Sequence, residues 1–338
     1  MMEWLAVWCD RLGLTWLVPL IRFANGQDRA YQVRVFLLQA GLPLLAIAMS
    51  LLTWQVVAVT VKSSTLTLPT PGQVWARGVE QWDEWRAEGP RRVAYEAEVK
   101  KNIADTGLSE AEVRAAVPYE HKQLFVDQVL LSLLTAFTGV GLAVLVAVPV
   151  GIICGLSASV FSMMNPLIQI LKPVSPLAWF PVVYLLANKT LSNDGLVSKS
   201  FVVAAVVVSL CSLWPALINT ANGVANVERD HLNVAKVLNL GFFAKVWRII
   251  LPAALPSIFT GIRLSLGIGW MVLIAAEMMA VSPGLGTFIW NWYQSSNDVA
   301  FSYLLLAVIV IGLIGFALDR IMIAVQRIIS HGNTAAIR

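Results

Sequence analysis

Three ionisable residues stand inside long apolar runs of this 338-residue sequence, and they are its first candidates for chemistry. Lys172 shares the segment LKPVSP with Ser175, while Arg263 and Glu277 stand near the two ends of a later run. Ionisable side chains within hydrophobic segments are functional candidates because their burial is costly. Lys172, Ser175 and Arg263, two cations and a hydroxyl, are therefore candidate functional residues. Glu277 suits a contact at a helix end or a hydrogen-bonded gate.

The segment around Lys172 favours a pathway because its prolines free backbone groups. Broken helices are tolerated in membranes where they are buried or line a cavity. The alternative for Lys172 and Arg263 is structural, since long cationic side chains near helix ends reach the membrane interface or brace a neighbouring helix.

Motifs for bond-making chemistry are absent from the sequence. It has no GxxxxGK[ST] phosphate-binding loop, no HExxH and no GxSxG, so we expect no ATP hydrolysis by this chain itself. Its three histidines are scattered and its three cysteines form no CxxC. The sequence therefore predicts no catalytic residue, no metal site and no bound cofactor. An intramembrane protease, which needs a nucleophile and a base within reach, is a distant alternative.

The composition predicts a membrane protein. Hydrophobic residues make up 58% of the chain and charged residues 13%, and the mean hydropathy is +0.72. A soluble globular domain carries about 25% charged residues. The net charge of +4 is not clustered, so it does not indicate nucleic-acid binding.

Six apolar runs predict an all-α fold with six membrane-spanning helices, since a span needs about 20 such residues. The runs cover residues 35–61, 131–156, 163–187, 201–218, 258–281 and 304–325. The second run contains a GxxxG pair, Gly151 and Gly155, which lets helices approach closely.

The regions around these runs complete the predicted organisation. We expect an interfacial helix in residues 1–34, a helical extracytoplasmic insertion at 62–123, a core at 124–327 and a tail at 328–338. Within the insertion, a helix is expected around residues 82–101, and Ser109 with Glu112 predicts a capping box. Basic residues collect in the loop 221–252 and in the tail, so the positive-inside rule places both termini in the cytoplasm.

The loop 221–252 carries a short amphipathic pattern. Leu232, Ala235 and Leu238 fall on one helical face, and such a helix outside the lipid suits a groove on a partner protein. Pro252 has no N–H and disfavours a helical residue before it, which predicts a corner between this helix and the next span.

This loop resembles the coupling loop of ABC importer permeases, whose pattern is Glu-Ala-Ala, three residues, Gly, nine residues and Ile-x-Leu-Pro. The end of the pattern and Ala235 match, Asn233 stands at the Glu position, and Asn239 stands at the Gly position with Gly241 two places later. From this resemblance, the residues expected to meet the ATPase are Leu232, Asn233, Ala235, Leu238, Asn239, Gly241, Ile249, Leu251 and Pro252.

The resemblance extends over residues 66–320. The segments LKPVSPLAWFPVVYLL and GLGTFIWNWYQSS look most like the nitrate, cyanate and bicarbonate branch, and sulfonate and taurine permeases are close relatives. It implies a type I ABC importer-like transmembrane domain in the bacterial inner membrane, with a second permease copy as its partner. Separate ATPase subunits would bind ATP and Mg, and a substrate-binding protein would deliver a small oxyanion, with nitrate as the first expectation from this resemblance. For such an anion, Lys172, Ser175 and Arg263 would be the pathway residues, since they offer two cations and a hydroxyl. A gradient-driven secondary transporter or a channel is the competing class.

Overall fold

The computed structural model describes residues 4, 17–26, 28–60, 68–107, 109–118, 123–191, 198–228, 237, 239–295 and 297–329. These residues form helices and no strand. The elements are α2 (Val18–Ala24), α3 (Arg29–Phe36), η1 (Leu37–Gly41), α4 (Leu42–Thr60), α5 (Pro71–Thr106), α6 (Glu110–Ala116), α7 (Phe125–Leu156), α8 (Ala158–Leu171), α9 (Pro176–Thr190), α10 (Lys199–Ala225), α12 (Phe242–Lys245), η2 (Val246–Ile250), α13 (Leu251–Ala280), α14 (Leu285–Ser295) and α15 (Asp298–Ile329).

The predicted all-α membrane fold is confirmed. Five helical stretches of the described chain are long and apolar enough to cross a membrane, and they cover Arg29–Thr60, Phe125–Leu156, Lys199–Ala225, Phe242–Ala280 and Val299–Ile329. The predicted third span is α8 followed by α9, which are bent by 99° at their junction. The count is therefore six spans if this bent pair is one of them.

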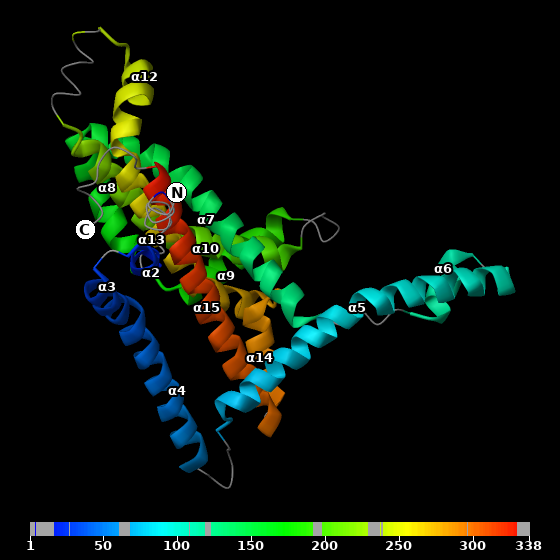
Figure 1. Ribbon diagram of the computed structural model, residues 1–338. Helices are drawn as coiled ribbons and strands as arrows, with labels where there is room; N and C mark the ends of the chain where they lie inside the picture. Colours follow the sequence, from blue (N-terminus) through cyan, green and yellow to red (C-terminus); the bar gives the residue numbers. More distant parts are fainter. Residues whose placement is uncertain are drawn as a thin grey trace.

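Close packing of α7, α10 and α13 forms the centre of the bundle (Figure 1). Gly151 and Gly155 of α7 face α10. A Cβ added at Gly151 would lie 2.7 Å from Thr220 Cβ, and a Cβ added at Gly155 would lie 2.6 Å from Val224 Cβ. The predicted GxxxG pair thus serves the α7–α10 contact. Small residues allow this approach, which membrane helices need because lipid gives them no hydrophobic drive to associate.

The first span stands apart from this bundle. Only 6% of the residues in the apolar window of Arg29–Thr60 are buried, and Figure 1 shows α4 separated from the other spans. Its far end is tied to the start of α5, because Trp54 Nε1 donates a hydrogen bond to the Pro69 carbonyl at 3.1 Å. Of the predicted interfacial helix, residues 1–3 and 5–16 lie outside the described residues.

The predicted helix in the insertion is longer than expected. α5 begins at Pro71, after a capping box between Thr70 and Gln73, and runs for 36 residues through Pro90. It extends away from the bundle at the end opposite α12 (Figure 1). The predicted capping box of α6 is confirmed, since Ser109 accepts from the Glu112 N–H and the Glu112 side chain accepts from the Ser109 N–H.

The predicted corner at Pro252 is wrong. α12, η2 and α13 form one helical stretch from Phe242 to Ala280. The π-helical turn η2 ends at Ile250, two residues before the proline, and the Leu251 N–H donates to the Val246 carbonyl five residues earlier. A π turn leaves room for the proline ring, and the missing N–H falls at the first turn of α13, where Pro is tolerated. The coupling loop is therefore joined to its span without a hinge at this point.

Candidate functional site

The end of the bundle that carries α12 holds the predicted coupling segment (Figure 1). Four predicted contact residues lie outside the described residues: Leu232, Asn233, Ala235 and Leu238. We call residues 232–252 the coupling segment, and the structure describes residue 237 and residues 239–252 of it. Its geometry explains how the sequence can depart from the family pattern.

Asn239 occupies the glycine position of the pattern and adopts the glycine conformation. Its φ is +48°, in the left-handed region that Gly, and next Asn, tolerates best. Gly241 has φ −63° and immediately precedes α12, so its backbone needs no glycine. Asn239 therefore has a backbone conformation that favours Gly, whereas Gly241 has one that any residue adopts.

The Ile-x-Leu-Pro end of the segment is buried through its x residue, Ile250, whose type the pattern does not specify. Ile250 is 2% exposed and packs in a cluster with Val224, Val227, Ala254 and Ile258. Its neighbours Ile249 and Leu251 are half-buried, and Pro252 is exposed. This cluster fixes the base of the segment against α10.

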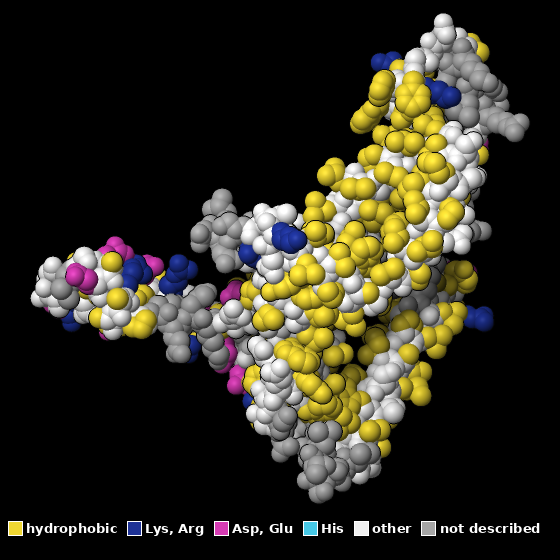
Figure 2. Space-filling view, turned by 180° about the vertical axis from the view of Figure 1, so that it is seen from behind, with side chains coloured by type: hydrophobic (Ala, Val, Ile, Leu, Met, Phe, Trp, Pro, Cys, Tyr) yellow, Lys and Arg dark blue, Asp and Glu magenta, His cyan; other side chains and the backbone are white. Residues whose placement is uncertain are grey.

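Large apolar side chains stand exposed on the same segment. Val237 is 85% exposed, Phe242 63%, Phe243 78% and Trp247 68%. Figure 2 shows apolar side chains next to Lys or Arg side chains at this end of the molecule. Apolar patches bordered by polar groups mark contact surfaces. The three aromatic residues were not among the predicted contact residues, although their place in a charged loop is a usable signal.

Lys172 and Ser175 lie together at the junction of the bent pair. α8 ends at Leu171, and Ser175 caps α9 by accepting the Leu177 N–H at 3.3 Å. The side chain of Lys172 is exposed. The predicted break in this segment is confirmed, and it places a cation and a helix N-terminus at one elbow.

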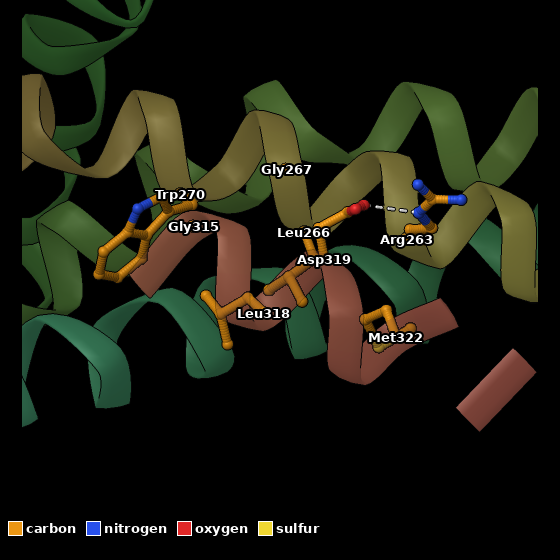
Figure 3. A pocket seen from close by; sticks show the side chains of 8 residues that line it. All are labelled: Arg263, Leu266, Gly267, Trp270, Gly315, Leu318, Asp319 and Met322. Carbon is orange, nitrogen blue, oxygen red and sulfur yellow. Dashed lines mark hydrogen bonds and ion pairs between the residues drawn. The ribbon is translucent and has the colours of Figure 1, made fainter. Parts of the chain in front are cut away.

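Arg263 is held elsewhere, by an ion pair between α13 and α15. Its Nε lies 2.7 Å from Asp319 Oδ1, and the two side chains are 34% and 37% exposed. Figure 3 shows the pair beside a cavity of about 220 Å³, with the guanidinium at the end away from Trp270. The cavity is lined by Arg263, Leu266, Gly267, Trp270, Gly315, Leu318, Asp319 and Met322. This geometry fits a brace for α13, and the pathway role of Arg263 stays a prediction.

Glu277 lies near the opposite end of α13 and is fully buried. Its carboxylate accepts hydrogen bonds from the Ser132 hydroxyl and from the Gly286 N–H. It therefore makes the helix-end contact that its position predicted. Within the described ranges, no group of three or more His, Cys, Asp or Glu side chains is placed to hold a metal ion.

A family model matches more than half of the chain, over residues 147–331. Its description is "binding-protein-dependent transport system inner membrane component". The matched region begins within α7 and includes the bent pair, α10, the coupling segment, α13, α14 and α15.

Similar proteins carry the names of permeases for nitrate, bicarbonate and taurine. The nitrate import permease protein NrtB of Synechococcus elongatus is 35% identical over 203 residues, which are 60% of this chain and 69% of that protein. The bicarbonate transport system permease protein CmpB of the same species is 38% identical over 201 residues, 59% of this chain and 68% of that protein. The taurine transport system permease protein TauC of Escherichia coli is 34% identical over 194 residues, 56% of this chain and 66% of that protein. The three names give three different substrates.

Proposed function

Because the chain belongs to the binding-protein-dependent transport system inner membrane components, we propose that it carries a small oxyanion, nitrate first, across the membrane. The chain is a multi-pass ABC importer permease of the nitrate, bicarbonate and sulfonate family. Nitrate and bicarbonate are both planar anions with three oxygens on a central atom, whereas a sulfonate is tetrahedral. The segments around Lys172 and α14 resemble the nitrate, cyanate and bicarbonate branch, which favours a planar anion over a sulfonate. We place nitrate before bicarbonate within this branch as the proposal that the uptake test below decides.

The observation that carries the proposal is the coupling segment and its attachment. Phe242, Phe243 and Trp247 present large apolar surfaces outside the bundle, and a groove on an ATPase subunit would cover them. The helix from Phe242 to Ala280 has 39 residues, so it extends about 58 Å at 1.5 Å per residue. A push on its α12 end would therefore reach the other side of the membrane.

The proposed arrangement follows from this attachment. The α12 end and both termini face the cytoplasm, where two ATPase subunits bind ATP and Mg. A second copy of this chain completes the translocation path, and a two-fold interface is the common arrangement. A substrate-binding protein delivers the anion on the side of α5.

The elbow between α8 and α9 is the proposed contact with the anion. Crossing lipid would strip an anion of its hydration at high cost, so a pathway offers it partial positive charge. Lys172 supplies a cation, and the N-terminus of α9 behind Ser175 supplies the positive end of a helix dipole. Arg263 is the third candidate, with the Asp319 contact as its competing role.

The test of the substrate is uptake of labelled nitrate by proteoliposomes that contain the chain with its ATPase and binding protein. We expect ATP-dependent uptake that unlabelled taurine does not compete, and loss of this uptake in Lys172→Ala with normal assembly. ATP-dependent uptake of bicarbonate or of a sulfonate, without uptake of nitrate, would refute nitrate as the substrate but keep the transporter class. Uptake that follows an ion gradient without ATP would refute the transporter class.

The test of the coupling surface is a pair of charge insertions. Phe243→Asp places a carboxylate on the exposed coupling segment, so we expect loss of ATPase copurification. Trp75→Asp makes the same kind of change at a side chain that is 76% exposed on α5, and it is the matched control. Equal copurification of the two variants would refute the docking surface.

A further inference from the structure

The carboxylate of Glu277 joins three helices at the end of the bundle opposite α12. Glu277 is 0% exposed. The hydroxyl of Ser132, on α7, lies 2.9 and 2.8 Å from its two oxygens, and the N–H of Gly286, on α14, donates to Oε2 at 3.1 Å. The Ser132 oxygen in turn accepts the N–H of Leu285 at 2.8 Å. We call these four residues the clasp.

The clasp satisfies the first amides of α14. Leu285 and Gly286 are the first two residues of this helix, and the N–H groups of a first turn have no partner within their own helix. The N-terminus of a helix also carries partial positive charge, which stabilises a nearby carboxylate. Among the described residues, no Lys or Arg forms an ion pair with Glu277. The α14 N-terminus and the Ser132 hydroxyl therefore provide the polar partners of this buried group.

The chain between α13 and α14 is built closely around the carboxylate. An added Cβ at Gly284 would collide with the Glu277 carboxylate, and one at Gly286 would collide with the Ile274 carbonyl and lie 2.8 Å from Glu277 Cβ. α13 ends at Ala280 and is followed by Val281 with φ +51°, a left-handed conformation that is strained for a β-branched residue. Such a conformation persists where the surrounding contacts hold it.

Further hydrogen bonds hold the same turn. The Ser282 N–H donates to the Glu277 carbonyl at 3.1 Å, and the Thr287 hydroxyl donates to the Ser282 carbonyl at 2.6 Å. The side chain and the backbone of Glu277 thus both take part in the turn. Glu277 is therefore the residue that contacts both sides of the turn between α13 and α14.

We propose that Glu277 is a positioning residue for transport, which fixes α14 to α7 and α13 so that α14 follows the movement of α13. This inference rests on the proposed function, because the movement starts at the coupling segment. Glu277 lies about one turn before the end of the helix that begins at Phe242. The clasp is where a displacement of that helix passes to α14.

The first experiment measures the clasp without any transport. Amide hydrogen exchange is followed in the purified chain on a peptide that covers residues 282–295. Glu277→Ala leaves the amide of Gly286 without its acceptor, so we expect exchange in this peptide to rise at least tenfold. Glu277→Gln keeps an acceptor oxygen for Gly286 but replaces one carboxyl oxygen by an amide NH2, which cannot accept a hydrogen bond, so we expect a rise of a few-fold.

Two serine variants distinguish loss of the clasp from a general loss of stability. Ser132→Ala removes the hydroxyl that links α7 to α14, and exchange at residues 282–295 should rise. Ser212→Ala removes an equally buried hydroxyl that, within the described part of the chain, donates to the Val208 carbonyl of its own helix at 2.7 Å and to no other group. Exchange in that peptide should stay unchanged in Ser212→Ala.

The second experiment measures coupling in the complete transporter with Glu277→Gln, which preserves the size of the side chain. We expect normal basal ATPase activity but at least a fivefold fall in nitrate taken up per ATP hydrolysed, while Ser212→Ala keeps the wild-type ratio. A substitution that only weakened folding would lower both activities together, and this outcome would overturn the positioning role. Unchanged exchange in Glu277→Ala would also overturn it. If the wild-type complex transports another anion, the ratio is measured with that anion, so a wrong substrate does not affect the clasp.

Discussion

Replacing Gly151 by Ala tests the packing on which the bundle depends. The new Cβ would lie 2.7 Å from Thr220 Cβ and 2.8 Å from the Leu217 carbonyl oxygen of α10. Carbon contacts are optimal near 3.5–4.0 Å, so the two helices must separate by about 1 Å. The carbonyl belongs to the helix backbone and cannot turn aside as a side chain can.

Gly141 supplies the control on the same helix. An added Cβ there meets nothing within 4 Å. Both substitutions gain the helix propensity of Ala over Gly, about 0.8–1.0 kcal/mol, and this gain cancels when the variants are compared. The difference is then the overpacking cost, which is about 1–3 kcal/mol. We expect Gly141→Ala to match or exceed the wild-type stability and Gly151→Ala to fall below Gly141→Ala by this amount.

The assay is reversible unfolding of the purified chain from mild detergent into SDS, followed by circular dichroism. The free energies of unfolding of the two variants are compared at the same SDS fraction. Equal stability of Gly151→Ala and Gly141→Ala would refute the close α7–α10 contact.

Three further predictions concern other parts of the molecule. Asn239→Gly should leave ATP-coupled uptake unchanged, because Gly adopts φ +48° without strain. Asn239→Val should lower the free energy of unfolding by about 1–2 kcal/mol, because Val is strained at this φ. Equal melting temperatures of Asn239→Gly and Asn239→Val would contradict this prediction. If the Arg263–Asp319 ion pair only holds α13 against α15, Arg263→Ala and Asp319→Asn should both lower the maximal uptake rate without changing the KM for nitrate. A KM that rises in Arg263→Ala but not in Asp319→Asn would place Arg263 in the anion pathway. Hydrogen bonds from Ser109 hold the pKa of Glu112 below its ordinary value, so the stability that ionised Glu112 gives to α6 is full above the unfolded pKa and is lost as the pH falls through the folded pKa. Amide hydrogen exchange in α6, corrected for intrinsic exchange rates, should therefore increase when the pH is lowered from about 6 to about 3. A Glu112→Gln variant that showed the same increase would disprove the link.

Much of the fold could be predicted because its signals are local. Apolar runs are long enough to span a membrane, and the capping box at Ser109 and Glu112 needs only residues three apart. The break near Lys172 was also predictable from its prolines. The end of the coupling pattern located the segment through Ile249, Leu251 and Pro252.

Other features could not be read from such signals. The π turn before Pro252 depends on how the whole helix is held, so a rule for the residue before proline predicted a corner where the helix continues. The buried anchor Ile250 looks like its neighbours in the sequence, and only its packing against α10 distinguishes it. The exposure of Phe243 and Trp247 likewise depends on the direction in which α12 leaves the bundle.

The sequence by itself determined that this chain is a helical membrane protein of the permease type, because hydropathy, capping and the coupling pattern are properties of neighbouring residues. It also marked Arg263 and Glu277 as unusual, because charge in an apolar run is visible without a structure. Only the tertiary structure decided what these charges meet. Arg263 contacts Asp319 56 residues away, and Glu277 contacts Ser132 145 residues away. Such partners are fixed by how helices pack against one another, and no spacing within a single segment encodes that.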